Sequence, residues 1–255
     1  MLDGRTVLVT GASAGIGEAC AVTLAAEGAR LILVARRRER LTALSEQLAR
    51  AHGSTPRVVE LDVRRRDAVN AAIESLPAKW RSIDILINNA GLSRGLDPLY
   101  EGAADDWEEM IDTNVKGLLW IDRAVTPGMV RRGSGHVIHI GSIAGRQTYP
   151  RGNVYCATKY AVRALTEGLR LDLAGTGVRV TSIDPGLVKT EFGAVRFRGD
   201  RERADSVYRG MTPLTADDVA QAVLFAATRP KHVTVGDILL LPTDQASAML
   251  VHRRE

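Results

Sequence analysis

The sequence predicts an α/β fold in which all 255 residues form one domain, a doubly wound parallel sheet of about seven strands with helices on both faces. Short runs rich in valine, isoleucine and leucine recur along the chain and are nearly continuous, as expected for parallel strands that are buried on both faces. Longer segments with apolar residues at helical spacing lie between these runs and indicate helices. Because the two patterns alternate, we expect right-handed crossovers that place helices on both sides of the sheet.

The predicted elements follow this alternation along the chain. One segment, 191–212, interrupts it because it is polar, rich in arginine and only loosely helical, and we expect it to form a substrate-loop insertion near the active edge of the sheet. Strands are predicted at residues 6–10, 30–35, 57–61, 83–88, 136–140, 178–184 and 238–241. The clearest helices are predicted at residues 37–51, 107–131, 153–173 and 216–227.

Composition excludes several classes of protein. The net charge of +4 comes from arginines interleaved with nearly as many acidic residues, whereas a nucleic-acid-binding face needs clustered cations and a recognition motif. No apolar run approaches the roughly 20 residues that span a bilayer, and the N-terminus does not resemble a signal peptide. The two cysteines, Cys20 and Cys156, argue against a disulfide framework. We therefore expect a cytoplasmic protein with a small-molecule substrate, no nucleic-acid or membrane partner, and no metal site.

The first predicted strand ends in a glycine-rich turn that enters an alanine-rich helix. Gly11, Gly15 and Gly17 lie in this turn. Glycines at such a place let the main chain approach a pyrophosphate, whose charge is stabilised by the N–H groups and dipole at the helix N-terminus. An ordinary strand-to-helix turn also favours glycine, but three glycines after the first strand favour a dinucleotide site.

Arginines, not an acid, follow the second predicted strand. An acid there would bind the ribose 2′-hydroxyl of NAD, whereas the guanidinium of Arg36 or Arg37 suits the 2′-phosphate of NADP. The arginines also fit the solvated start of a helix, which would apply above all to Arg38 and Arg40. Asp62, after the third strand, could contact the adenine amino group or simply form a turn.

Amide side chains and glycines mark the middle of the chain. Asn88 and Gly91 lie at the end of the fourth predicted strand, where they fit either a cofactor ribose or a plain turn. Asn114 and Gly117 fall inside a predicted helix although both are poor helix formers. They indicate either a local kink or a bound water.

Two hydroxyl groups should converge after the fifth predicted strand. Ser142 lies in a glycine-flanked turn, and Tyr155 and Lys159 follow in a predicted helix. Residues four apart share a helix face, so the lysine ammonium would lower the pKa of the tyrosine and favour proton transfer. No arrangement of a Ser-His-Asp triad is apparent, and the simplest interpretation of His136 and His139 in the strand is packing or solvent.

Taken together, these motifs resemble the short-chain dehydrogenase/reductase family over nearly the whole chain, in the order and approximate spacing of that family. The resemblance implies a Rossmann-type fold, NADP(H) as cofactor and a homotetramer. It implies that Tyr155 is the general acid or base, Ser142 polarises the substrate oxygen, Lys159 lowers the tyrosine pKa and holds the nicotinamide ribose, and Asn114 positions a relay water. Val188 and Thr190 would anchor the carboxamide and a phosphate. The implied cofactor-binding set is Gly11, Ser13, Gly15, Ile16, Gly17, Arg36, Arg37, Asp62, Val63, Asn88, Ala90, Gly91, Tyr155, Lys159, Pro185, Gly186, Val188 and Thr190.

Within the family the chain is most similar to NADP-dependent dehydrogenases of 3-hydroxy acids, including serine and allo-threonine. The similar stretches include residues 152–155, 195–200 and 251–253. A carboxylate substrate needs a cation, and the candidates are Arg146, Arg151 and Arg196, although most such arginines are solvated surface residues. The alternatives are a reductase of a neutral aldehyde, ketone or sugar, and a non-catalytic NADPH-binding regulator.

Overall fold

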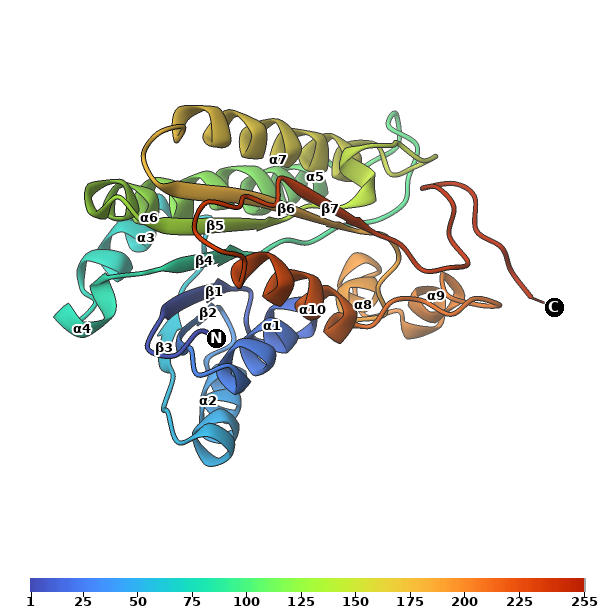
Figure 1. The fold of residues 1–255 in the computed structure, drawn as a ribbon. Helices are drawn as coiled ribbons and strands as arrows, with labels where there is room; N and C mark the ends of the chain where they lie inside the picture. Colours follow the sequence, from blue (N-terminus) through green and yellow to red (C-terminus); the bar gives the residue numbers. More distant parts are fainter. Residues whose placement is uncertain (255) are drawn as a thin grey trace.

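The computed structural model describes residues 1–254 and contains one seven-stranded, all-parallel sheet with the strand order β3-β2-β1-β4-β5-β6-β7. The order reverses between β1 and β4, so the sheet is doubly wound, as the sequence predicts (Figure 1). The strands are β1 (Thr6–Thr10), β2 (Arg30–Ala35), β3 (Arg57–Glu60), β4 (Ile85–Asn88), β5 (Gly135–Ile140), β6 (Val178–Pro185) and β7 (Asp237–Leu240). Each lies within two residues of its predicted position.

Helices cover both faces of the sheet (Figure 1). One face packs on α1 (Gly15–Ala26), α2 (Arg38–His52) and α10 (Ala216–Ala227), and small residues such as Ala21 and Ala220 are buried where α1 and α10 meet. The other face packs on α3 (Arg66–Glu74), α6 (Leu118–Arg132) and α7 (Asn153–Asp172). Because both faces are covered, β1 is buried at every position, which explains its unbroken apolar pattern.

The helix predicted at 107–131 is interrupted. It consists of α5 (Ala104–Ile111), a π-helical turn (Asp112–Gly117) and α6, and it begins three residues before the predicted start. The π turn contains Asn114 and Gly117, so the kink that these poor helix formers indicate is present. One further short helix, α4 (Ala78–Arg81), precedes β4.

The segment 191–212 lies beyond the carboxyl end of β6, as expected of an insertion at the active edge. It contains two short helices, α8 (Phe192–Arg196) and α9 (Arg201–Ser206), and a buried cluster beside it joins Leu92, Met110 and Tyr155. Figure 1 shows both helices at the same side of the molecule as the C-terminal segment. Across residues 1–254, the model contains no helix long and apolar enough to cross a bilayer.

Candidate active site

The turn between β1 and α1 is shaped for an anionic group. Gly11 and Gly15 have φ angles of 67° and 57°, a region that side-chain-bearing residues rarely adopt. A Cβ atom at Gly17 would overlap the carbonyl oxygen of Gly11. The N-cap residue Ala14 offers no side-chain hydrogen bond, so the first N–H groups of α1 are left without a capping partner. These features fit the pyrophosphate of a dinucleotide, whose charge the helix N-terminus would stabilise.

Arg37 contacts this turn directly. Its Nε donates to the Ser13 hydroxyl at 3.2 Å, and its Nη1 donates to Glu191 Oε2 at 3.0 Å. Arg40 Nη1 donates to Glu191 Oε1 at 2.6 Å, so this arginine, expected to be a plain surface residue, shares the same carboxylate. Arg36 is exposed at the end of β2. Of the two arginines expected at a 2′-phosphate, Arg37 is therefore the one held against the phosphate turn.

The next two candidates serve the local structure. Asp62 accepts hydrogen bonds from the Arg64 main chain at 3.0 Å and from the Arg64 guanidinium at 2.6 Å. Burial acts to raise the pKa of this carboxyl, but these bonds and the charge of Arg64 outweigh it and hold the pKa below its usual value. Val63 is buried and lies against Gly117 in the π turn. Asp62 thus stabilises the turn after β3 and Val63 packs against the π turn. A contact between Asp62 and adenine stays a prediction.

Residues at the end of β4 form hydrogen bonds to neighbouring elements through side-chain and main-chain amide groups. The Asn88 side chain points away from the main-chain turn and donates to the Leu118 carbonyl at 3.0 Å, which leaves only its main chain for a cofactor. The main-chain N–H of Ala90 donates to Thr10 Oγ1 at 3.0 Å. A Cβ atom at Gly91 would lie 3.2 Å from Asn114 Oδ1, so glycine permits a close approach between this turn and the π turn.

Asn114 joins three elements. Its Oδ1 accepts from the Leu92 N–H at 2.8 Å, and its Nδ2 donates to the Leu92 carbonyl at 2.8 Å and to Thr158 Oγ1 at 3.0 Å. Thr158 in turn donates to the Tyr155 carbonyl at 2.7 Å. The amide therefore fixes α7 at the level of Tyr155 relative to the chain after β4.

Ser142 and Tyr155 do converge. Ser142 follows β5, caps a short 3₁₀ turn through a 3.1 Å bond from the Ala144 N–H, donates to the Pro185 carbonyl at 3.5 Å, and is near enough to Tyr155 to affect the pKa of its phenol. Tyr155 is 9% exposed, and burial raises the pKa of its phenol well above the usual value. Tyr149 raises this pKa further, whereas the charge of Arg196 and the Ser142 hydroxyl act to lower it.

Lys159 is hydrogen-bonded to the main chain, and its expected effect on the pKa of Tyr155 stays a prediction. Its ammonium is buried and donates to the Ile140 carbonyl at 2.9 Å. Burial lowers the pKa of Lys159 to about 8, although Asp184 acts in the opposite direction. The positive charge beside the phenol comes from Arg196.

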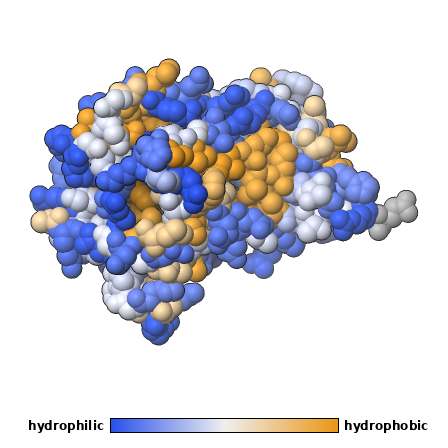
Figure 2. Space-filling model, viewed as in Figure 1, coloured by the Kyte–Doolittle hydropathy of each residue, from blue (hydrophilic) through white to orange (hydrophobic). Residues whose placement is uncertain are grey.

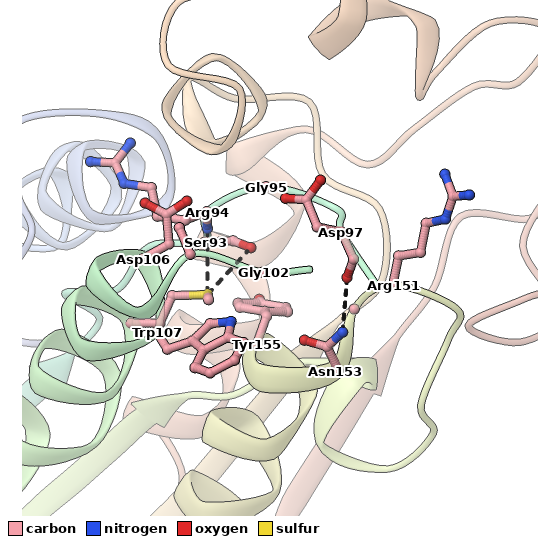
Figure 3. A pocket seen from close by; sticks show the side chains of 13 residues that line it. Ser93, Arg94, Gly95, Asp97, Gly102, Asp106, Trp107, Arg151, Asn153 and Tyr155 are labelled. Carbon is pink, nitrogen blue, oxygen red and sulfur yellow. Dashed lines mark hydrogen bonds between the residues drawn. The ribbon is translucent and has the colours of Figure 1, made fainter. Parts of the chain in front are cut away.

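The three arginines proposed for a substrate carboxylate have different surroundings. Arg146 forms a 2.6 Å ion pair with the buried carboxylate of Asp184, which occupies its guanidinium and argues against a substrate role. Arg151 is exposed, and Figure 3 shows its side chain extending away from Tyr155. Arg196 instead lies 5.3 Å above the Tyr155 ring. Of the three, Arg196 is the one that the structure brings to the proposed catalytic residues.

Arg196 is held by residues that sequence reasoning did not identify. Its Nε donates to Ser93 Oγ at 3.0 Å, its Nη2 donates to Tyr149 Oη at 3.0 Å, and its guanidinium packs 5.1 Å from the Phe192 ring. Ser93 and Tyr149 lie in loops far from α8 in sequence. No periodicity marks them, and only the folded arrangement of two loops and α8 reveals the set.

The segment that carries Arg196 is fastened over the site. Arg94 Nη1 donates to the Val195 carbonyl at 2.5 Å, and the Gly95 N–H donates to the Arg196 carbonyl at 3.0 Å. Arg94 is itself oriented by Glu109 at 2.6 Å, and Arg198 pairs with Asp106. Figure 3 shows Arg94, Asp106 and Trp107 around the adjoining pocket, with Tyr155 facing it.

The turn after β6 completes the edge. The Pro185–Gly186 turn continues into a bridge between Val188 and Leu214, and the buried Gln245 side chain accepts from the Leu187 N–H at 2.8 Å. The Thr190 side chain would lie 3.2 Å from a Cβ atom at Gly15. Thr190, the expected phosphate anchor, therefore lies beside the phosphate turn, and the contacts of Val188 and Thr190 with a cofactor stay a prediction.

Comparisons with known proteins agree with this arrangement. Residues 5–200 match the family described as short chain dehydrogenase. The chain is 51% identical to the NADP-dependent 3-hydroxy acid dehydrogenase YdfG of Salmonella typhi, over 97% of this chain and 99% of that protein. It is 43% identical to the serine 3-dehydrogenase of Agrobacterium fabrum, over 95% and 96% of the two chains. The solved closed form of a serine dehydrogenase complexed with NADP⁺ superposes with a TM-score of 0.93 at 47% identity, covering 98% of this chain and 100% of that chain.

Proposed function

The chain belongs to the short-chain dehydrogenase/reductase family, and we propose that it is an NADP-dependent oxidoreductase that interconverts the hydroxyl group of a 3-hydroxy acid, such as serine or allo-threonine, with a carbonyl. The observation that carries this proposal is the stacking of Arg196 on Tyr155, which puts a cation for a carboxylate next to a hydroxyl group able to exchange a proton. Reduction of NADP⁺ by a panel of hydroxy acids tests it.

Tyr155 exchanges the proton of the substrate oxygen. Its phenol is buried and lies near Ser142, so a substrate oxygen placed between the two hydroxyls would accept a hydrogen bond from each. Because burial raises the pKa of the phenol, the free site favours the protonated form, which is the form that donates a proton in carbonyl reduction.

Lys159, on α7 with Tyr155, and Asn114, in the π turn, support this exchange. The buried Lys159 ammonium has a pKa of about 8, so its charged and neutral forms are present in similar amounts near that pH. Its bond to the Ile140 carbonyl fixes it beneath the turn that carries Ser142. Asn114 hydrogen-bonds to the Leu92 main chain and to Thr158, and we propose that it positions the relay water.

NADP supplies the hydride acceptor when it is bound. The residues that would hold it are the glycines of the phosphate turn, Arg37 at the 2′-phosphate, and the turn after β6 at the carboxamide. Arg37 suits the phosphate because its guanidinium can give two parallel hydrogen bonds. No acid directly follows β2, but the phosphate would have to share Arg37 with Glu191, whose Oε2 accepts from its Nη1 at 3.0 Å.

Replacing Arg37 with alanine should therefore raise the Kd for NADPH by about 10- to 100-fold and leave the Kd for NADH within about twofold, because a charged hydrogen bond contributes about 1.5–3 kcal/mol. Fluorescence titration of both cofactors measures the two constants. Arg38→Ala is the matched control, since Arg38 is exposed and its nearest carboxylate is Glu60 at 3.8 Å. Equal losses for NADPH and NADH would contradict the assignment.

We also propose a homotetramer built through the helices that carry Asn114 and Tyr155 and through the C-terminal strand. Several large apolar side chains on these elements are exposed, and Figure 2 shows an apolar patch where Figure 1 places β7 and the C-terminal segment. They are Ile111, Leu119, Tyr160, Leu171, Leu239, Met249 and Leu250. Sedimentation equilibrium measures the mass, and a monomer at micromolar concentration would oppose this proposal.

The buried free cysteines Cys20 and Cys156 fit the reducing cytoplasm, where we place the protein.

A further inference from the structure

A second polar cluster is buried behind the catalytic residues, where β5 packs on α6 and α7. The His139 ring is fully buried, with Nε2 3.0 Å from Asp122 Oδ2 and Nδ1 2.8 Å from Thr166 Oγ1. Asn88 Nδ2 lies 3.1 Å from Asp122 Oδ1. The proposed reaction uses neither His139 nor Asp122.

The hydrogen bonds of Thr166 determine the proton on one ring nitrogen. Its hydroxyl lies 2.7 Å from the Val162 carbonyl oxygen, a normal O–H···O distance that requires a hydrogen between the two oxygens. A hydroxyl has one hydrogen, so Thr166 can only accept from the ring. Nδ1 of His139 must therefore carry a proton.

The surroundings of Asp122 determine the other nitrogen. Both carboxylate oxygens lie about as close to Nε2, and one of them also accepts from Asn88 Nδ2. A carboxylate in this position is an acceptor on each side. A proton must therefore lie between Nε2 and Asp122. With that proton on the ring the pair is an imidazolium and a carboxylate, and with it on the acid both groups are neutral.

His136, on the same strand, provides a contrast. Its Nε2 lies 2.8 Å from Thr181 Oγ1, whose own hydrogen is directed to the Val235 carbonyl at 2.7 Å. Its Nδ1 is buried and has no hydrogen-bond partner among residues 1–254. Burial, with a smaller contribution from Arg179, lowers the pKa of His136 to about 3. His136 is therefore neutral.

The cluster reaches the elements that carry Ser142, Tyr155 and Lys159. Asn88 accepts at its Oδ1 from Thr10 Oγ1 at 3.3 Å, and Thr10 Oγ1 accepts from the Ala90 N–H at 3.0 Å. His139 lies in β5 just before Ser142, and Thr166 lies in α7 with Tyr155 and Lys159. A continuous buried chain of hydrogen bonds therefore joins the ends of β1, β4 and β5 to α7.

We propose that His139 is a positioning residue, an imidazolium that, through Asp122 and Thr166, holds the β5 end with Ser142 in place relative to α7 with Tyr155. This proposal rests on the proposed function for its catalytic part, because Ser142 and Tyr155 must meet at one substrate oxygen. Displacement of one hydroxyl by a fraction of an ångström would reduce the fraction of bound substrate that is aligned for proton exchange.

The protonation state is tested by ¹⁵N NMR of the histidine-labelled full chain. The spectrum is recorded at mildly alkaline pH. His139 should then still show two protonated ring nitrogens, whereas His136 should show one protonated and one bare nitrogen. A bare nitrogen on His139 would overturn the ion pair, and this result does not depend on any turnover.

The positioning role is tested by kinetics of three variants. His139→Gln should lower kcat about tenfold or more with a smaller change in the KM for NADP, whereas the matched His136→Gln should leave kcat within about twofold. The double variant Asp122→Leu, His139→Leu removes both buried charges, so it should fold as well as the native chain and still show the loss in kcat. Native kcat in a stably folded double variant would refute the positioning role. Absence of turnover in the native protein would instead refute the proposed function.

Discussion

Tyr155→Phe is expected to lower kcat by about a thousandfold while the Kd for NADPH stays within about threefold, because a positioned general acid or base contributes on the order of 10²- to 10⁴-fold. The substitution removes the phenol oxygen that would exchange the proton and keeps the ring on which Arg196 stacks. Steady-state kinetics with a hydroxy acid and fluorescence titration with NADPH separate the two effects.

Tyr160→Phe is the matched control for this substitution. Tyr160 lies on the same helix and its hydroxyl donates to the Arg146 carbonyl at 2.6 Å, so the variant loses a comparable hydrogen bond away from the proposed reaction centre. Its kcat should stay within about twofold of the native value. A fully active Tyr155→Phe protein would exclude Tyr155 as the proton donor.

Arg196→Met is expected to raise the KM for a 3-hydroxy acid about 10- to 100-fold and to change the KM for a neutral secondary alcohol by less than about threefold. Methionine keeps much of the apolar stem against Phe192 but loses the charged donors, and a charged hydrogen bond contributes about 1.5–3 kcal/mol. Initial rates over a range of substrate concentrations give both constants.

The neighbouring Arg198 provides the control for charge alone. It is exposed and pairs with Asp106, so Arg198→Met removes one positive charge from the same loop without touching Tyr155. Its KM for the hydroxy acid should stay close to native. If Arg196→Met impairs hydroxy acids and neutral alcohols equally, the guanidinium holds the loop and not the carboxylate.

The fold could be predicted because local patterns determine it. Parallel strands buried on both faces are apolar at nearly every position. Gly11 and Gly15 of the phosphate turn have positive φ angles, which favour glycine. The π turn realises one of the two interpretations left open for Asn114 and Gly117, a kink and not only a bound water, since both are poor helix formers. In each case the signal lies within a few neighbouring residues.

The direction of charged side chains could not be predicted, because their partners are distant in sequence. Spacing placed Lys159 beside Tyr155, but its ammonium turns to the Ile140 carbonyl. Arg146 and Arg196 look alike in sequence, yet Asp184 binds the first and Ser93 with Tyr149 directs the second over the site. Burial likewise raises the pKa of Tyr155, an effect that only the folded environment contains.

The most direct test of the central claim is the reduction of NADP⁺, followed by absorbance, with serine, allo-threonine and other 3-hydroxy acids beside neutral alcohols and sugars of similar size. The geometry of Arg196 and Tyr155 predicts kcat/KM values for 3-hydroxy acids at least about tenfold above those for the neutral compounds. Higher values for neutral alcohols or sugars would contradict the substrate class, and tight NADPH binding without turnover of any compound would contradict catalysis itself.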